Sequence, residues 1–173
     1  MNDEEQKKIL KTRAQALAKE PMKEDASAEQ LEVIEFLLGP ERYGIETRYI
    51  REVYPLRDLT PLPCTPPFVA GVVNVRGAIL SLIDLKAFFG LPKKELTDLN
   101  KVVVIQNRDM EFGLLADEVP GVQRFYAASI QLSLPTLTDI RAEYLKGVTE
   151  DRLIILDAEK ILSDKKIIVH EEV

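Results

Sequence analysis

The sequence predicts a mainly β protein made of two tandem five-stranded barrels, with short helices and a helical extension at the N-terminus. From Glu29 onward the chain consists of short runs rich in Val, Ile, Leu and aromatic residues, separated by tight turns, which is the pattern of strands. Only the stretches after Asp84 and Asp157 favour short helices in this region. An internal repeat indicates that one small β unit occurs twice.

The N-terminal residues 1–29 differ in composition from the rest of the chain. They are rich in Ala, Lys, Glu and Gln and nearly free of β-branched and aromatic residues. Leu10, Ala14 and Leu17 form a narrow apolar stripe at helical spacing, and Pro21 ends it. This pattern predicts either a loosely attached surface helix with a linker after it or a docking helix for a partner.

The predicted domain covers 30–163, with barrels at roughly 42–97 and 98–157 that could exchange strands, and a tail at 164–173. A unit of this size with about five short strands suits a small barrel, because closure removes exposed sheet edges. The candidate strands are residues 31–38, 43–46, 50–56, 71–75, 78–83, 101–106, 111–116, 122–127 and 152–157.

Local signals mark one turn and two helix starts. Arg76-Gly77 predicts a two-residue hairpin turn, since glycine accepts the positive φ that such turns require. Asp84 and Asp157 each stand between a strand and a short helical pattern, where a carboxylate can accept backbone N–H bonds as an N-cap. Capping is therefore the preferred interpretation of these two residues over catalysis.

The repeat consists of four motifs in the same order, at offsets between 69 and 76 residues. Each match is weak alone, but the shared order and nearly constant offset indicate a duplicated unit. The matches are Tyr43-Gly44-Ile45 with Phe112-Gly113-Leu114, Ile50 and Val53 with Val119 and Val122, Phe68-Val69-x-Gly71-Val72 with Tyr144-Leu145-x-Gly147-Val148, and Leu82-Ile83-Asp84 with Ile155-Leu156-Asp157.

Composition excludes several classes of protein. A chain of 173 residues with a net charge of −6 is long enough for one domain or two small barrels, and it lacks the basic balance of a nucleic-acid binder. The single cysteine, Cys64, excludes an internal disulfide. No stretch approaches the roughly 18 apolar residues of a membrane span, and the first residues do not resemble a secretory signal. We therefore expect a soluble cytoplasmic protein that does not insert into the membrane.

Groups for catalysis or metal binding are scarce. The sole histidine, His170, lies in a polar tail, so neither a Ser-His-Asp site nor a zinc cluster is expected. No glycine-rich phosphate loop is present in the sequence. The adjacent Asp117 and Glu118 are interpreted as solvated surface charge, because neighbours in a strand point to opposite faces. The expectation is a non-enzymatic protein without a cofactor or metal.

The segment CTPPFVAGVVNVRGAILSLIDLKAFFG (64–90) resembles the hallmark of the CheW family. In that hallmark a proline, an aromatic residue and a glycine precede a hydrophobic-Asn-hydrophobic-Arg-Gly run. An apolar strand that ends in Asp-Leu then follows. The matching positions are Pro66, Phe68, Gly71, Asn74, Arg76, Gly77, Asp84 and Leu85. Segments 43–53, 112–122, 143–148 and 152–162 also look like the family, so the resemblance covers about 31–163.

The resemblance implies that the two barrels are SH3-like and pack side by side. It also implies a scaffold that couples membrane chemoreceptors to the histidine kinase CheA, at the inner face of the membrane and without a cofactor. One barrel would meet the regulatory domain of the kinase, and the groove between the barrels would hold the cytoplasmic helical tip of a receptor. Nothing in the family accounts for the N-terminal extension.

The receptor-binding residues implied by the resemblance are Arg76, Glu52, Ile50 and Val102. Arg76 would present a permanently charged guanidinium at a hairpin tip, and Glu52 is its acidic match. The alternative for these two residues is an exposed ion pair worth less than about 1 kcal/mol. Ile50 and Val102 map to apolar positions near the receptor surface, and the alternative for both is core packing.

The kinase-binding residues implied by the resemblance are Val119, Gly121 and Val122, beside a turn at Pro120. Plain barrel packing is the alternative for them. Two other functions remain open: the same scaffold in a chemotaxis-like pathway that controls pili or gliding, and an SH3-like module for an unrelated peptide.

Overall fold

The computed structural model describes residues 29–92, 99–131 and 140–168. Sheet A contains, in spatial order, β8 (Glu118–Tyr126), β1 (Gln30–Leu38), β2 (Glu41–Glu46), β10 (Ile154–Leu156) and β9 (Leu145–Val148). Sheet B contains β3 (Ile50–Pro55), β6 (Lys101–Gln106), β7 (Glu111–Ala116), β5 (Ala78–Ile83) and β4 (Val69–Val75). Short helical elements connect them: η1 (Thr47–Tyr49), α2 (Leu85–Phe89), η2 (Ala127–Ser129), η3 (Ile140–Tyr144), α3 (Ala158–Ser163) and α4 (Lys165–Ile168).

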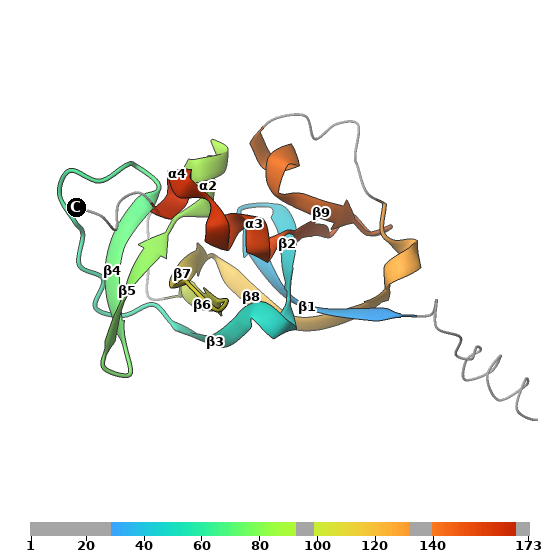
Figure 1. The fold of residues 1–173 in the computed structure, drawn as a ribbon, viewed down its shortest axis with the longest axis horizontal. Helices are drawn as coiled ribbons and strands as arrows, with labels where there is room; N and C mark the ends of the chain where they lie inside the picture. The colour runs from blue at the N-terminus through green and yellow to red at the C-terminus, as the bar shows by residue number, and fades with distance from the viewer. Residues whose placement is uncertain (1–28, 93–98, 132–139, 169–173) are drawn as a thin grey trace, which may run out of the picture.

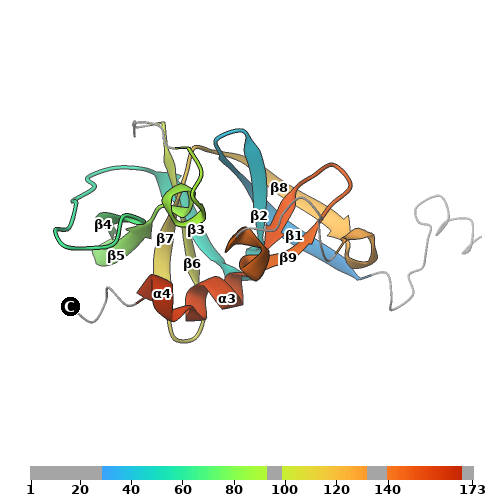
Figure 2. The same ribbon diagram turned by 90° about the horizontal axis from the view of Figure 1, so that it is seen from above.

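The predicted mainly β fold with two five-stranded units is confirmed. Figures 1 and 2 show β4 and β5 of sheet B at one end of the molecule and β9 of sheet A towards the other. The helix predicted within residues 1–29 lies outside the described residues, except for Glu29.

The two sheets have the same arrangement once the sequence repeat is applied to the strands. Strands β1 to β5 of the first copy correspond to β6 to β10 of the second, and corresponding strands occupy equivalent places in the two sheets. The first two strands of each copy, however, lie in the sheet of the other copy. The parallel pairs β2–β10 and β5–β7 join the copies, through Gly44 opposite Ile155 and Gly113 opposite Leu82.

Because of this strand exchange, the predicted ranges 42–97 and 98–157 do not correspond to one sheet each. Each range contributes strands to both sheets. The repeat motifs record the order of strands along the chain, whereas the pairing partner of a strand is a long-range property that the motifs do not contain.

In each sheet, one bridge joins an edge strand to the segment that follows the other edge strand, and this bridge closes the sheet. In sheet B, Thr60 exchanges both backbone hydrogen bonds with Val72, at 2.8 and 2.9 Å. In sheet A, Gln131 does the same with Val148, at 2.7 and 2.9 Å. Closure of this kind is what distinguishes a small barrel from an open sheet with two exposed edges.

The matched glycines of the repeat permit this closure. A Cβ at Gly71 would lie 2.3 Å from the carbonyl oxygen of Thr60, and a Cβ at Gly147 would lie 2.1 Å from Cγ2 of Ile130. No side chain fits at either distance, so only glycine lets the closing segment approach its partner strand.

Gly71→Ala should lower the free energy of unfolding by about 1–3 kcal/mol more than Gly121→Ala, the usual cost of overpacking. The two glycines have nearly the same φ, +146° and +148°, but a Cβ at Gly121 meets nothing within 4 Å. Both variants therefore carry the same backbone strain, and only Gly71→Ala adds a collision. Urea unfolding of the two variants measures the difference, and equal losses would show that close approach does not matter at Gly71.

Within the described residues, apolar side chains form three buried clusters. The largest, which we call the inter-sheet cluster, contains Phe36 and Tyr43 from sheet A and Ile105 and Phe112 from sheet B. A second cluster fills the interior of sheet B, and a smaller third one around Val33 fills sheet A. The molecule is therefore held together mainly by the layer between its two sheets.

The C-terminal helices belong to this core. Ile161 of α3 and Ile167 of α4 are fully buried in the inter-sheet cluster. The tail predicted from residue 164 onward is thus part of the folded domain at least as far as Ile168. The sequence of this tail has a short apolar pattern but no strand character, so it did not indicate that the tail packs into a β fold.

The predicted caps and hairpin are confirmed. The Asp84 carboxylate accepts hydrogen bonds from the backbone N–H groups of Lys86 and Ala87 at the start of α2, and Asp157 accepts one from Lys160 in α3. The repeated Asp thus has the same structural role in both copies, as an N-cap at a strand-to-helix junction.

Asp117, at the passage from β7 in sheet B to β8 in sheet A, is not solvated surface charge as the sequence indicated. Its carboxylate binds the Lys86 ammonium at 2.9 and 3.1 Å, and the side chain of Lys86 is only 3% exposed. It also accepts hydrogen bonds from the Gly39 amide at 2.6 Å and the Asn100 side chain at 3.2 Å. One carboxylate therefore ties together four separate parts of the chain at the sheet junction.

Candidate functional site

Arg76 lies at the tip of the β4–β5 hairpin, as predicted. Val75 pairs with Ala78, so Arg76 and Gly77 form a two-residue turn with φ values of 52° and 88°. The side-chain oxygen of Asn74 accepts a hydrogen bond from the Gly77 amide at 2.9 Å and fixes the turn. The hairpin thus presents the Arg76 guanidinium, whose side chain is 77% exposed, on a well-defined backbone.

Glu52 meets Arg76 from β3, the edge strand at the other end of sheet B. The guanidinium Nε donates to Glu52 Oε1 at 3.0 Å, and the Glu52 side chain is 17% exposed. The structure therefore brings together two of the residues selected from the sequence. An ion pair with one highly exposed partner contributes at most about 1 kcal/mol to folding, so stability alone gives little reason for it.

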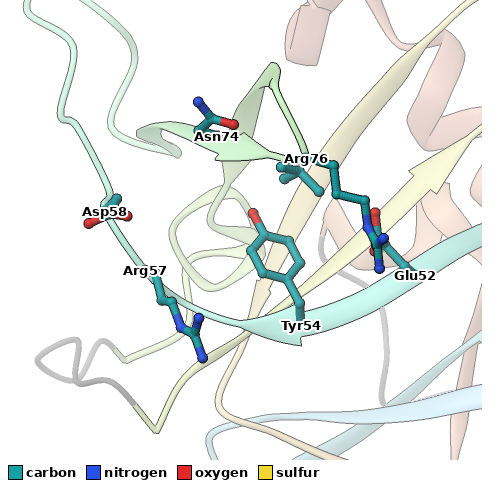
Figure 3. A pocket seen from close by; sticks show the side chains of 7 residues that line it. Glu52, Tyr54, Arg57, Asp58, Asn74 and Arg76 are labelled. Carbon is teal, nitrogen blue, oxygen red and sulfur yellow. The ribbon is translucent and has the colours of Figure 1, made fainter.

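A pocket of about 340 Å³ opens beside this pair. It is lined by Glu52, Tyr54, Arg57, Asp58, Asn74, Val75 and Arg76. Figure 3 shows the Tyr54 ring rising from β3 towards the β4–β5 hairpin, with Arg76 reaching down to Glu52. The pocket lies where β3 and β4 diverge, at the seam that the Thr60–Val72 bridge closes further along.

Two polar atoms at this pocket are buried without a hydrogen-bond partner: Oε2 of Glu52 and the hydroxyl of Tyr54. Burial of the phenol and the negative charge of Glu52 both raise the pKa of Tyr54 above its ordinary value. Tyr54 therefore remains protonated at neutral pH and offers a donor, while Glu52 offers an acceptor. Sequence reasoning missed Tyr54, although its spacing of two from Glu52 places both on one face of a strand.

The other two residues of the predicted receptor site lie differently. Ile50 is half-buried in β3 and packs against the inter-sheet cluster. Val102 is fully buried, so in the folded chain it offers no exposed surface to a receptor. Both faces of β6 are covered. Val102 belongs to the cluster in the interior of closed sheet B, and its neighbour Val103 belongs to the inter-sheet cluster.

The three predicted kinase-binding residues lie in β8 but do not form one patch. Exposure alternates strictly along this strand, so Val119 and Gly121 lie on the inner face and Val122 on the outer face. Val119 packs against the inter-sheet cluster, whereas Val122 is 52% exposed. Tyr126, four residues on and 50% exposed, shares the outer face and was missed from the sequence.

An exposed ion pair flanks Val122 on the outer face of β8. The Arg124 guanidinium binds Glu32 of β1 at 2.9 and 3.0 Å, with side chains 70% and 40% exposed. The outer side chains of Val122, Arg124 and Tyr126 thus form a surface that we call the β8 face. It presents an apolar side chain, a cation and a phenol in a row.

Within the described parts of the chain, no helix is long and apolar enough to cross a membrane.

Comparison with known proteins identifies the family. The model of the CheW-like domain matches residues 32–166. The chain is similar to the chemotaxis protein CheW of Treponema pallidum, with 32% identity over 80% of this chain and 86% of that protein. It is also similar to Protein FrzA of Myxococcus xanthus, with 34% identity over 66% of this chain and 71% of that protein.

A solved structure agrees with this result. The crystal structure of the scaffolding protein TtCheW from Thermoanaerobacter tengcongensis superposes with a TM-score of 0.66 and 30% identity, over 74% of this chain and 89% of that one. That neighbour has the tandem SH3-like fold, which agrees with the two closed five-stranded sheets described above. Fold, repeat and sequence similarity agree, and the chain belongs to the CheW-like family.

Proposed function

We propose that this chain couples the cytoplasmic tips of chemoreceptors to the histidine kinase CheA and catalyses no reaction itself. As a member of the CheW-like family, the chain is an adaptor of chemotaxis signal transduction. We assign one surface of the protein to the receptor and another to the kinase. Contact with receptors holds the protein in the cytoplasm at the inner face of the membrane.

The receptor contact is assigned to the β4–β5 hairpin and the adjoining edge of β3. The single observation that carries this assignment is the Glu52–Arg76 pair, whose arginine side chain is 77% exposed at a hairpin tip held by the Asn74–Gly77 hydrogen bond. Such a pair adds little to folding, but it can bind a partner strongly once an interface excludes water from it. Ile50 lies in the same strand as Glu52 and packs against the inter-sheet cluster.

The kinase contact is assigned to the β8 face. Val122 and Tyr126 expose large apolar surface on one strand, and interface cores are enriched in aromatic side chains and in arginine. Gly121 and Val119 lie on the inner face of β8, so the proposed contact does not include them. The two proposed contacts lie on different sheets, so one molecule can bind both partners at once, as a scaffold must.

Reconstitution with its partners tests this function. Added to receptor-containing membranes and CheA, the protein should change the rate of kinase autophosphorylation, while the pure protein should hydrolyse no ATP. Turnover by the isolated protein that survives repurification and disappears on mutation of one of its residues would contradict the non-enzymatic assignment.

A second candidate is the same scaffold in a chemotaxis-like pathway with another output, such as pili or gliding. The similarity to Protein FrzA, a relative that is not named as a chemotaxis protein, favours this second candidate. The receptors and the kinase recovered with the tagged protein from its own cells decide between the two pathways.

A further inference from the structure

The pocket beside the Glu52–Arg76 pair contains an unsatisfied acceptor and an unsatisfied donor, Oε2 of Glu52 and the hydroxyl of Tyr54. A buried polar group without a partner destabilises the folded state, so folded proteins rarely retain one without a reason. One donor and one acceptor, both without a partner at the same pocket, indicate a ligand that supplies both missing partners.

The charges of the pocket restrict the ligand further. Two arginines and two acidic residues line it, so their formal charges cancel and the lining as a whole favours neither an anion nor a cation. Val75 adds an apolar wall. A neutral group that both donates and accepts hydrogen bonds, carried on a short apolar stem, fits this lining, and a side-chain carboxamide has these features.

We propose that this pocket receives the carboxamide of an asparagine or glutamine from the receptor tip, whose NH₂ donates to Glu52 and whose carbonyl accepts from Tyr54. This inference rests on the proposed function and makes Tyr54 a specificity-determining residue of the receptor contact. Arg76 has a mostly exposed side chain that binds the other Glu52 oxygen, so it can shift at small cost as the carboxamide enters.

The Tyr54→Phe variant of the full chain gives opposite effects on folding and on binding. Removal of a hydroxyl that has no partner should raise the melting temperature by about 2–4 °C, the shift that corresponds to roughly 1 kcal/mol in a chain of this size. The same change should lower the affinity for a receptor-tip fragment about tenfold. Tyr49→Phe is the matched control, because Tyr49 is also half-buried but lies in η1, outside both proposed contacts, and its hydroxyl is not a buried atom without a partner; it should change neither quantity.

An unchanged melting temperature would mean that water already satisfies the hydroxyl, and an unchanged affinity would mean that no ligand group reaches it. Either result overturns the inference. If Arg76→Glu abolishes receptor binding while Tyr54→Phe does not weaken it, the carboxamide inference fails and the proposed function stands. If the wild-type protein does not bind the receptor fragment at all, the proposed function fails.

A titration with acetamide tests the pocket without any receptor. Acetamide should shift the NMR signals of the Tyr54 ring and the Glu52 side chain in the wild-type protein, and Tyr54→Phe should weaken its binding. Acetate, which carries a charge, and acetone, which lacks a donor, should shift them far less. Equal responses to the three compounds would contradict carboxamide recognition.

Discussion

Arg76→Glu should lower the affinity for a receptor-tip fragment by roughly 2–5 kcal/mol, which is one to several decades in Kd. The variant leaves the Glu52 carboxylate facing another negative charge in an interface from which water is excluded. Folding should change by less than about 1 kcal/mol, because the Arg76 side chain is 77% exposed in the free protein. Titration calorimetry beside thermal melts measures both quantities.

The matched control is Arg124→Glu, on the β8 face. Arg124 is exposed to a similar extent and is also paired with a glutamate, but on sheet A. Arg124→Glu should weaken binding to the CheA regulatory domain and leave receptor binding intact, the reverse of Arg76→Glu. If both variants lose the same partner, the two proposed surfaces are not separate.

A charge swap separates two origins of the Arg76 effect. Glu52→Arg alone should also weaken receptor binding. The combination with Arg76→Glu should restore part of the affinity if the contact between these two side chains shapes the site, and none if each contacts the receptor separately. Unchanged receptor affinity in both single variants, with intact folding, would show that the receptor site lies elsewhere.

Asp117→Asn should lower the free energy of unfolding by about 3–5 kcal/mol, because removal of one partner leaves the other charge buried and uncompensated. The remaining charge is that of Lys86, whose side chain is 3% exposed. Urea unfolding measures the loss. Glu32→Gln breaks the exposed pair with Arg124 and is the control, with an expected loss below about 1 kcal/mol.

The effect of Asp117→Asn should depend on pH. Burial raises the pKa of Asp117, but hydrogen bonds from Lys86, Gly39 and Asn100 outweigh it, and the pKa ends below its ordinary value of 3.8. A carboxyl group with a depressed pKa in the folded state stabilises fully above its unfolded pKa and loses this contribution as pH falls through the folded pKa. The difference between the wild type and Asp117→Asn should therefore be constant near neutral pH and shrink below pH 3.8. A difference that does not change in acid would contradict the ion pair.

The local features of the fold could be predicted from the sequence, and the long-range ones could not. The hairpin at Arg76 and the caps at Asp84 and Asp157 depend on a few neighbouring residues, so short motifs contain them. The exchange of β1–β2 and β6–β7 between the two copies depends on pairing across the whole chain. The role of Asp117 likewise depends on Lys86, which is 31 residues away in sequence.

The candidate site shows the same division. The resemblance placed Val102 near a receptor surface, and an apolar strand sequence does not show whether one or both of its faces are buried. The separation of Val119 from Val122 could have been found, because residues three apart in a strand lie on opposite faces. The same alternation links Glu52 to Tyr54, but only the structure shows that the hydroxyl of Tyr54 lacks a partner.

A bridging measurement tests the central claim most directly, that one molecule binds a receptor and the kinase at once through separate surfaces. An immobilised receptor-tip fragment is mixed with the CheA regulatory domain, with and without the protein. Retention of the kinase domain should require the wild-type protein and should be lost with either Arg76→Glu or Arg124→Glu. Each variant should still bind the one partner that its intact surface contacts. Kinase retention that persists with both variants, or mutual exclusion of the two partners from the wild-type protein, would contradict the account.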